Sequence, residues 1–396
     1  LNLIGWSNGE QTNIGQRVDK PGSKGHPIVY GMPWCGTSGI ASTKSYPLGG
    51  IVLLGRSDND HFESLTNDQK IVRVMQRMIS PVWTEDMLET NLKCAAKLAK
   101  ADLRTLMVGE FPELQGIMGE YYARHDGEAE EVAQAVSQHY LPRFAGDVLP
   151  DGPVATALAI ADKLETLAGM FGIGQMPTGD KDPFALRRHA LGVLRMLIEK
   201  NLTVKLDELV AIAFAVETKV EGVTNASEAL THFFFDRLRV MMREAGYTAQ
   251  EVDAVLAKHD TDLAQTPKKL AAVHKFMQLP ESASLAAANK RIANILKKSA
   301  DVQTGEVDKE LLVEEAEKRL HDVLGDHEPI AKLFYEKGEY EGMLATLTPL
   351  KDPVDAFFAD VMVNSEDEKL RLNRLALLKR LYSLMNRVAE LSRLAI

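Results

Sequence analysis

One histidine and two aspartates of the chain are of the residue types that bind divalent metal ions. Asp102, His139 and Asp162 lie in the segments LAKADL, AVSQHYLP and AIADKL. Imidazole and carboxylate groups are ligands of catalytic metal ions, which activate water for the hydrolysis of phosphate esters. These three side chains alone would fill the coordination shell of a metal poorly. We therefore expect no bound metal and no catalytic residue in this chain.

The same three segments resemble those of the HD-type metal phosphohydrolases, which require a histidine, an adjacent His-Asp pair and a later aspartate. Ala101 stands where the histidine of the pair would be, and the literal His125-Asp126 pair falls too late, in a link between helices. The resemblance implies a helical scaffold of HD type that has lost its metal. His139 and Asp162 would then be capping or hydrogen-bonding residues. An active phosphohydrolase is the alternative that Ala101 disfavours.

A second group of residues is suited to binding phosphate. In TGDKDPFALRRHALGVLR, Arg187, Arg188 and Arg195 cluster on an expected helix, and Lys181 precedes them in a glycine-containing loop. Arginine side chains and the N-terminus of a helix both bind phosphate well. Two aspartates stand beside these residues, so from the residues alone an ion-paired or solvated surface is an equal alternative.

Basic residues also line two expected helices of the C-terminal third. They are Lys290, Asn294, Lys297 and Lys298 on the first of these helices, and Arg371, Arg374, Lys379 and Arg380 on the last. Proteins read single-stranded RNA with cationic and aromatic side chains, so Phe334, Tyr335 and Tyr382 are candidates for stacking on bases. Aromatic residues at helical spacing are more often part of a core.

The elements that must position these residues are mostly helices. From Leu92 onward, apolar residues recur every three or four positions, which is typical of amphipathic helices. The expected helices cover residues 92–108, 128–140, 154–171, 183–200, 206–217, 226–245, 249–258, 284–299, 309–324, 329–336, 340–350, 353–362 and 368–394. We expect Asp182 to cap the helix that Pro183 begins. The Thr-Pro and Leu-Pro pairs at residues 266–267 and 279–280 are predicted breaks.

Residues 1–91 follow a different pattern, rich in glycine and proline. HPIVYGMPW and GGIVLLGR indicate short strands, and residues 68–79 indicate a helix. GMPWCGTS nearly matches a phosphate-binding loop, but Thr37 replaces the lysine that contacts the phosphates, so we expect no nucleotide site here. The block is similar to the C-terminal part of HPr-kinase-like and PEP-carboxykinase-like proteins, which implies a small α/β fragment.

Composition limits the class of protein and its partners. The 396 residues suffice for two or three domains, and no apolar run reaches the length of a membrane span. The net charge of −10 disfavours non-specific binding to nucleic acids, although local basic surfaces can still contact RNA. Cys35 and Cys94 form no disulfide framework, which suits a reducing compartment. We expect a cytoplasmic protein that binds neither DNA nor a membrane.

Three long blocks carry a family resemblance. GEFPELQGIMGEYYARHDGE, AIADKLETLAGMFGIG and TGDKDPFALRRHALGVLR, in this order, resemble the β subunit of the bacterial heterotetrameric glycyl-tRNA synthetase. ANKRIANILKK and LRLNRLALLKRL are similar to the helical (DALR-like) anticodon-binding domain that this subunit shares with arginyl-tRNA synthetases. The resemblance covers about residues 92–396. It implies a mainly α fold, with an HD-like domain and connector at 92–280 and an anticodon-binding domain at 281–396, preceded by the α/β fragment 1–91.

The resemblance also implies a function. In that family, a separate α subunit activates glycine with ATP and Mg, and the β subunit binds the tRNA. We expect this chain to be the C-terminal part of a tRNA-binding β subunit, without a cofactor and inactive alone, with the α subunit and tRNA(Gly) as partners. The basic residues near Arg188 would contact the acceptor arm, and those of the C-terminal third the anticodon arm. A non-catalytic RNA-binding remnant of a synthetase is the alternative. Family members carry further N-terminal domains, and we expect residues 1–91 to stand in their place.

Overall fold

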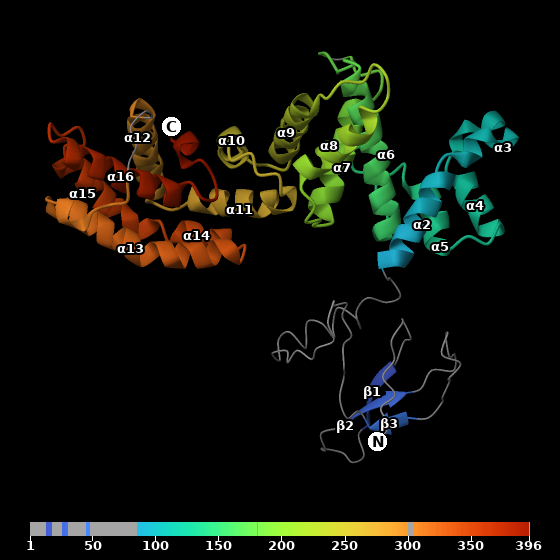
Figure 1. Cartoon of the computed structure of the whole chain (residues 1–396), viewed down its shortest axis with the longest axis horizontal. Helices are drawn as coiled ribbons and strands as arrows, with labels where there is room; N and C mark the ends of the chain where they lie inside the picture. Colours follow the sequence, from blue (N-terminus) through green and yellow to red (C-terminus); the bar gives the residue numbers. More distant parts are fainter. Residues whose placement is uncertain are drawn as a thin grey trace. The chain divides into compact units, whose positions relative to one another are not determined.

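The computed structural model of the chain describes residues 13–17, 26–30, 45–47, 85–179, 181–299 and 305–395 (Figure 1). The chain divides into two compact units, Leu1–Thr84 and Glu85–Ile396. The boundary lies a few residues before the position predicted from the sequence, because a helix already begins at Glu85.

The described part of the first unit is a three-stranded antiparallel sheet with the order β1-β2-β3. Its strands are β1 (Asn13–Arg17), β2 (His26–Tyr30) and β3 (Ser45–Pro47). In the central strand, Val29 is opposite Ile14 of β1 and Tyr46 of β3. The strand predicted in HPIVYGMPW is therefore confirmed over its first five residues. The run GGIVLLGR, the predicted helix 68–79 and the loop containing Thr37 lie outside the described residues.

The second unit is helical, as predicted. Its helices are α2 (Glu85–Leu98), α3 (Leu106–Glu110), α4 (Ile117–His125), α5 (Glu130–Gln138), α6 (Gly152–Gly172), α7 (Leu186–Glu199), α8 (Leu206–Glu217), α9 (Ser227–Glu244), α10 (Ala249–Leu256), α11 (Thr266–Phe276), α12 (Ser282–Lys298), α13 (Glu315–Glu336), α14 (Tyr340–Ala345), α15 (Lys351–Asp360) and α16 (Glu368–Met385). Short 3₁₀ turns include Ala101–Arg104, Pro112–Leu114 and Leu391–Leu394. None of the described helices is both long and apolar enough to cross a bilayer.

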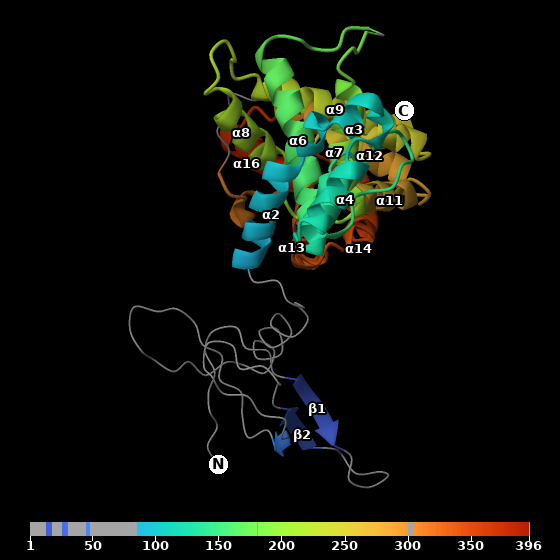
Figure 2. The same ribbon diagram turned by 90° about the vertical axis from the view of Figure 1, so that its right-hand side faces the viewer.

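Helix α6 is the centre of the first half of this unit. It packs against α2, α5, α7 and α8, and Figure 2 shows α2 lying beside it. Its sequence is apolar on nearly every side, which is expected of a helix that other helices surround. Ala159, Leu167 and Phe171 are buried along its length. Because α6 also carries Asp162 and α7 carries Arg188, this packing brings together the two groups of candidate residues in the first half of the unit.

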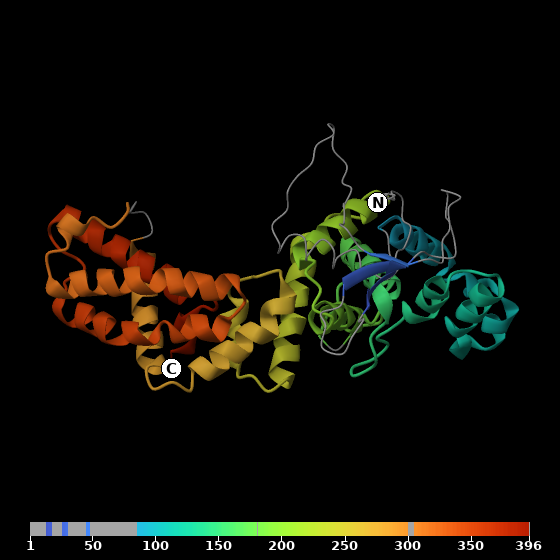
Figure 3. The same ribbon diagram turned by 90° about the horizontal axis from the view of Figure 1, so that it is seen from below.

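The second half of the unit is a bundle of α12 to α16. Helix α13 packs against α14, α15 and α16, and the orange and red helices lie side by side in Figures 1 and 3. A buried amide pair fixes α12 to the end of α16: Asn289 donates to Asn386 (2.6 Å), and Asn386 donates back to Asn289 (2.9 Å). The Asn386 side chain also accepts the backbone N–H of Leu391 (2.8 Å). The packed amides hold the chain end against α12.

Several predicted helix boundaries are wrong. The helix expected at 92–108 breaks after Leu98, and α3 restarts at Leu106 with the Thr105 side chain accepting the backbone N–H of Val108. The helix expected at 368–394 ends at Met385, because the amide of Asn386 takes over the hydrogen bonds of the following turn.

Proline positions account for two further differences. The segments predicted as two helices, 309–324 and 329–336, contribute instead to α13, which is continuous through Pro329. A proline inside a helix costs about 3 kcal/mol, and the packing of α13 on three neighbouring helices offsets that cost. Pro267 stands in the first turn of α11, a helix absent from the prediction, where its missing N–H has no helical partner to lose.

Candidate nucleic-acid interface

One face of α12 is exposed and basic. Lys290, Asn294, Lys297 and Lys298 are all exposed, while Leu285 and Ile292 are buried in the core. The helix contains no carboxylate between Ser282 and Lys298, and within the described residues none of these three lysines forms an ion pair. The basic residues expected along this helix are therefore exposed, and no side chain of the described residues neutralises their positive charge.

Neighbouring contacts on the same helix fix its orientation. The guanidinium of Arg291 lies 4.2 Å from the ring centroid of Phe358, and the hydroxyl of Ser284 donates to Asp355 (3.1 Å). Both partners belong to α15, which α12 contacts. These contacts with α15 hold α12, and with it the basic face, in a defined direction.

Arg374 of α16 is not a surface residue, which corrects the prediction that it contacts RNA. Its Nε donates to the carboxylate of Glu317, and its Nη1 donates to the carbonyl of Met362 (2.8 Å). Glu317 is fully buried and also accepts the backbone N–H groups of Val313 and Glu314 (2.9 Å each). Both carboxylate oxygens of Glu317 and two of the three guanidinium nitrogens of Arg374 are therefore hydrogen-bonded inside the bundle.

The remaining basic residues of α16 differ in their surroundings. Arg380 forms a two-pronged pair with Glu328 of α13, with both hydrogen bonds 2.8 Å long. Arg371 is half-buried, 3.7 Å from Glu368. Lys379 is exposed and has no ion pair in the described part of the chain. Of the four predicted residues on α16, Lys379 alone combines exposure with an unpaired charge.

The three aromatic candidates are partly buried and pack against the core. The ring of Tyr335 contacts that of Tyr340 (5.6 Å between centroids), and the hydroxyl of Tyr382 donates to Glu390 (2.8 Å). Phe334 would touch any side chain added at Gly342, since its ring lies 2.8 Å from that position. These contacts favour the alternative that the aromatic residues belong to the core.

In the first half of the unit, the predicted HD-type residues do not converge on one point. The buried carboxylate of Asp102 accepts the backbone N–H groups of Gly116 (2.7 Å) and Gly119 (3.2 Å), at the beginning of α4. His139 is buried and its Nδ1 lies 2.9 Å from the carbonyl of Val136. Among the described residues there is no group of three or more His, Cys, Asp or Glu side chains that could hold a metal ion.

Lysines supply the positive charges near Asp162. The Lys100 Nζ lies 2.5 Å from the Asp162 carboxylate. The next residue, Lys163, is buried and donates to the carbonyls of His139 (3.0 Å) and Leu141 (2.8 Å), and burial lowers its pKa to about 8. Gly192 of α7 leaves room for this lysine, because an added Cβ there would lie 3.0 Å from the Lys163 Cε.

The helix that carries the arginine cluster begins later than predicted. Helix α7 starts at Leu186, since Ala185 adopts a left-handed conformation with φ of 54°. The Asp182 carboxylate nevertheless accepts the backbone N–H groups of Leu186 (2.8 Å) and Arg187 (3.0 Å). Asp182 therefore caps α7 as predicted, although the helix begins four residues after it and not at Pro183. The predicted first residue of the helix, Pro183, is wrong, whereas the predicted capping residue, Asp182, is confirmed.

Two of the four basic candidates in this region already bond to other groups of the protein. Arg187 donates to the carbonyl of Gly179, and Arg195 pairs with Glu199 (2.6 Å) and donates to the carbonyl of Asp147 (2.8 Å). Lys181 and Arg188 are exposed, and neither has an ion pair within the residues that the structure describes.

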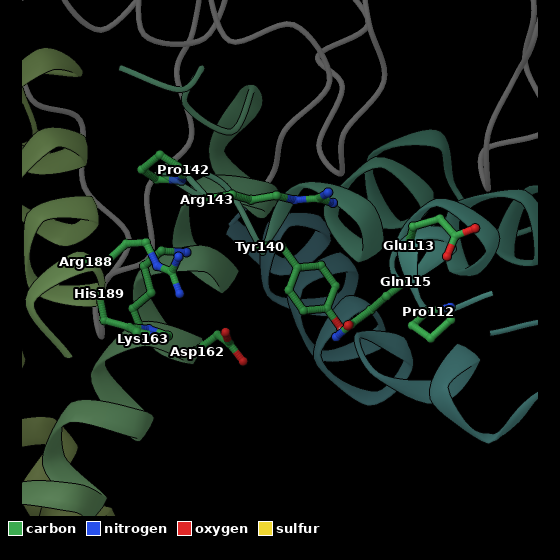
Figure 4. A pocket seen from close by; sticks show the side chains of 10 residues that line it. All are labelled: Pro112, Glu113, Gln115, Tyr140, Pro142, Arg143, Asp162, Lys163, Arg188 and His189. Atoms are coloured by element: carbon green, nitrogen blue, oxygen red, sulfur yellow. The ribbon is translucent and has the colours of Figure 1, made fainter. Parts of the chain in front are cut away.

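A cavity of about 320 Å³ connects Arg188 with the region around Asp162 (Figure 4). Its charged and polar lining includes Glu113, Arg143, Asp162, Lys163, Arg188 and His189. Arg143, Lys163 and His189 were not among the residues predicted from the sequence. His189 and Lys163 are direct neighbours of residues that were singled out, but an isolated basic residue gives no signal of the cavity that it faces.

Comparison with known proteins places these features in a family. The family model described as glycyl-tRNA synthetase beta subunit matches residues 63–257, and the model described as DALR anticodon binding domain matches residues 285–391. The chain belongs to the glycyl-tRNA synthetase β-subunit family. The first match contains the cavity, and the second contains the basic face of α12.

Individual members of this β-subunit family are closely similar to the chain. A glycine–tRNA ligase beta subunit of Dechloromonas aromatica is 55% identical over 332 residues, which are 83% of this chain and 47% of that protein. One of Leptothrix cholodnii is 57% identical over 309 residues, 78% of this chain and 43% of that protein. The chain thus spans less than half the length of these relatives. The family match begins at residue 63, so the resemblance extends upstream of the Leu92 limit expected from the quoted blocks.

Proposed function

We propose that this chain is the tRNA-binding part of a glycine–tRNA ligase β subunit, and that it recognises the anticodon arm of tRNA(Gly) through the basic face of α12. One observation carries the proposal: Lys290, Lys297 and Lys298 are exposed and unpaired in a segment that matches the DALR anticodon-binding model. Lysines that meet a phosphate backbone supply affinity without base specificity. Asn294, in the middle of the same face, has an amide that can donate to and accept from a base edge.

The overall charge of the protein makes a local surface necessary. A chain with a net charge of −10 repels RNA over most of its surface, so binding depends on places where cations are not neutralised. The face of α12 is such a place, because the helix has no carboxylate of its own. We extend the proposal to Lys379, which is exposed on α16, and not to Arg374, which is buried.

The wider assignment follows the family. We propose a cytoplasmic protein in which residues 92–280 form an HD-like domain with its connector and residues 281–396 form the anticodon-binding domain. A separate α subunit would activate glycine with ATP and Mg, and Lys181 and Arg188 would contact the acceptor arm. The non-catalytic RNA-binding alternative differs in lacking this partner, so capture of the α subunit by the chain distinguishes the two. The phosphohydrolase alternative is disfavoured, because Lys100 neutralises Asp162.

The test is a double substitution, Lys290→Ala with Lys297→Ala, in the full chain. Each lost phosphate contact should reduce the slope of log affinity against log salt concentration by about 0.7, which is about 5-fold in affinity per lysine at about 0.1 M salt. Affinity for tRNA(Gly), measured by fluorescence anisotropy over a salt series, should fall accordingly. The helical circular dichroism and the melting temperature should stay nearly constant, because both lysines are exposed.

The matched control is Lys219→Ala with Lys258→Ala, which removes the same charge from exposed positions outside the DALR match. The control should keep the salt slope of the original protein. Equal losses in both double variants would mean that only net charge matters. Unchanged binding in the α12 variant, with the fold intact, would show that this face is an ordinary solvated surface.

A further inference from the structure

The cavity beside Asp162 has a charge distribution that the anticodon proposal does not use. Figure 4 shows Arg188, Lys163 and His189 on one side, Gln115 and Glu113 on the other, and Tyr140 between them. The basic side comes from α6 and α7, and the opposite side comes from the 3₁₀ turn Pro112–Leu114 and the residue after it. Asp162 lies on the same side as Arg188 and Lys163, so cations outnumber carboxylates at that end, whereas the opposite end is neutral to acidic.

The cations at this cavity retain hydrogen-bonding capacity. Lys163 donates to two carbonyl groups, which leaves its ammonium a further N–H donor. Arg188 and Arg143 are exposed, and the described residues offer neither of them a carboxylate partner. The negative charge of Asp162 is already balanced by Lys100. The lining thus has an excess of positive charge, and guanidinium groups are well matched to phosphate oxygens.

His189 adds a polar group without a partner. Its Nδ1 is buried and makes no hydrogen bond within the described structure. Burial and the nearby Lys163 lower the pKa of this histidine, so the ring is neutral at pH 7 and can donate one hydrogen bond. In the tautomer that carries the proton on Nδ1, this nitrogen is a buried donor without a partner, which is costly, and an anion in the cavity would supply the acceptor.

Size limits the ligand. A volume of about 320 Å³ lies at the lower end of the range for sites that bind small molecules, which is about 300–1,000 Å³. It exceeds what a single inorganic anion fills. The half-buried ring of Tyr140 and the amide of Gln115, which donates to the Tyr140 hydroxyl (2.8 Å), line the part of the cavity away from the basic end. Such groups suit a sugar or a base.

We propose that this cavity binds a nucleotide through its phosphate, with the phosphate between Arg188, Lys163 and His189 and the nucleoside toward Tyr140 and Gln115. The ligand chemistry is a phosphate monoester on a nucleoside, carried either by a free mononucleotide or by the phosphorylated end of an RNA strand. No bond is made or broken in this proposal. The first source is independent of the proposed tRNA function, and only the second rests on it.

The experiment is calorimetric titration of the full chain with AMP, with adenosine, and with a short single-stranded RNA that carries either a 5′-phosphate or a 5′-hydroxyl. AMP or the phosphorylated RNA should bind, and adenosine and the hydroxyl RNA should bind at least about tenfold more weakly, which corresponds to about 1.4 kcal/mol. Binding of AMP assigns the free nucleotide as a ligand, and binding of the phosphorylated RNA alone assigns the strand end.

Substitutions locate the site. Arg188→Ala should weaken the phosphate-dependent binding at least about fivefold, as expected for the loss of one phosphate contact. Arg143→Ala removes the guanidinium that lies 5.9 Å from the ring centroid of Tyr140, at the nucleoside end, and should weaken AMP binding as well. Arg104→Ala removes an exposed arginine away from the cavity lining and should leave it unchanged. Both cavity arginines are exposed, so the circular dichroism should be preserved. Absence of binding by every phosphorylated ligand, or binding that survives both cavity substitutions, would overturn the proposal.

Nucleotide binding at the cavity can be tested independently of the proposed binding of the anticodon arm by α12. Lys290→Ala with Lys297→Ala should leave AMP binding unchanged, because these lysines do not line the cavity. Absence of tRNA(Gly) binding by the original protein, with its AMP binding intact, would refute the proposed function and leave the cavity assignment standing. Intact binding of tRNA(Gly), without any phosphate-dependent binding at Arg188, would refute the cavity assignment and leave the proposed function standing.

Discussion

At the residue scale, the protein places lysines where a metal-dependent enzyme would need a cation. Lys100 pairs with Asp162, and Lys163 satisfies two backbone carbonyls in the turn after α5. A lysine ammonium neutralises a carboxylate but cannot act as the Lewis acid that activates water. Asp102 is used instead to hold the beginning of α4. The side chains that resemble an HD-type site therefore support the fold.

Arg374 shows how a charged residue can belong to the core. It is 5% exposed and paired with Glu317, which is 0% exposed. Removing one partner of such a pair leaves the other charge buried and unpaired. We expect Arg374→Met to lower the free energy of unfolding by about 3–5 kcal/mol, measured by denaturant titration followed by circular dichroism.

The double variant Arg374→Met with Glu317→Leu is the control for this prediction. Replacing both members of a buried pair by apolar residues is often neutral, so it should recover much of the lost stability. Full stability of Arg374→Met, together with a loss of tRNA affinity, would contradict the structural role and restore this arginine as an RNA contact.

These residues also show what the sequence could and could not predict about the site. Helical spacing alone separates Lys290 and Lys297 from the buried Ile292, and the structure confirms that separation. The same spacing cannot reveal that Arg374 faces a glutamate 57 positions away, because the pairing depends on how α13 crosses α16. Arg143 and His189 were missed for the same reason, since the cavity exists only after α6 and α7 have packed.

At the element scale, close helix packing depends on particular glycines. Gly119 lies where α4 meets α5, and a Cβ at this position would come within 2.6 Å of the Val136 Cγ1 and 3.2 Å of the Asp102 carboxylate. We expect Gly119→Ala to reduce stability by about 1–3 kcal/mol, because the two helices must separate to admit the methyl group. Thermal unfolding followed by circular dichroism measures the effect.

Gly109 is the matched control, since it lies in α3 with no atom close to the position of an added Cβ. Gly109→Ala should stabilise the protein by about 0.5–1 kcal/mol, as alanine favours helix more than glycine does. Equal effects of the two substitutions would refute the close approach of α4 and α5.

Helix existence was easier to predict than helix ends. The helix at 206–217 was predicted with both of its ends, because apolar spacing defines it throughout. The starts of α3 and α7 and the end of α16 depend on Thr105, Asp182 and Asn386, whose side chains replace backbone partners. Whether a polar side chain caps a helix or faces solvent is decided by tertiary contacts, so spacing alone misplaces these boundaries.

At the scale of the whole molecule, an acidic protein carries a local basic surface within the segment that matches the DALR anticodon-binding model. The net charge is −10, and the DALR match from residue 285 to residue 391 contains α12 and its unpaired lysines. Since long-range repulsion is screened by salt over about 10 Å at 0.1 M, a few local cations are enough to bind RNA at physiological ionic strength. Recognition should therefore be confined to a small footprint.

A site-specific photo-crosslink from α12 to tRNA measures directly which arm of the tRNA lies against the basic face. A benzoylphenylalanine that replaces the exposed Asn294 in the full chain reports which nucleotides lie against the basic face, and one that replaces the exposed Lys219 serves as the control. If α12 binds the anticodon arm, position 294 should crosslink to nucleotides of the anticodon arm of tRNA(Gly), and position 219 should not. Crosslinks from position 294 to the acceptor arm, or none at all with tRNA bound, would contradict this binding.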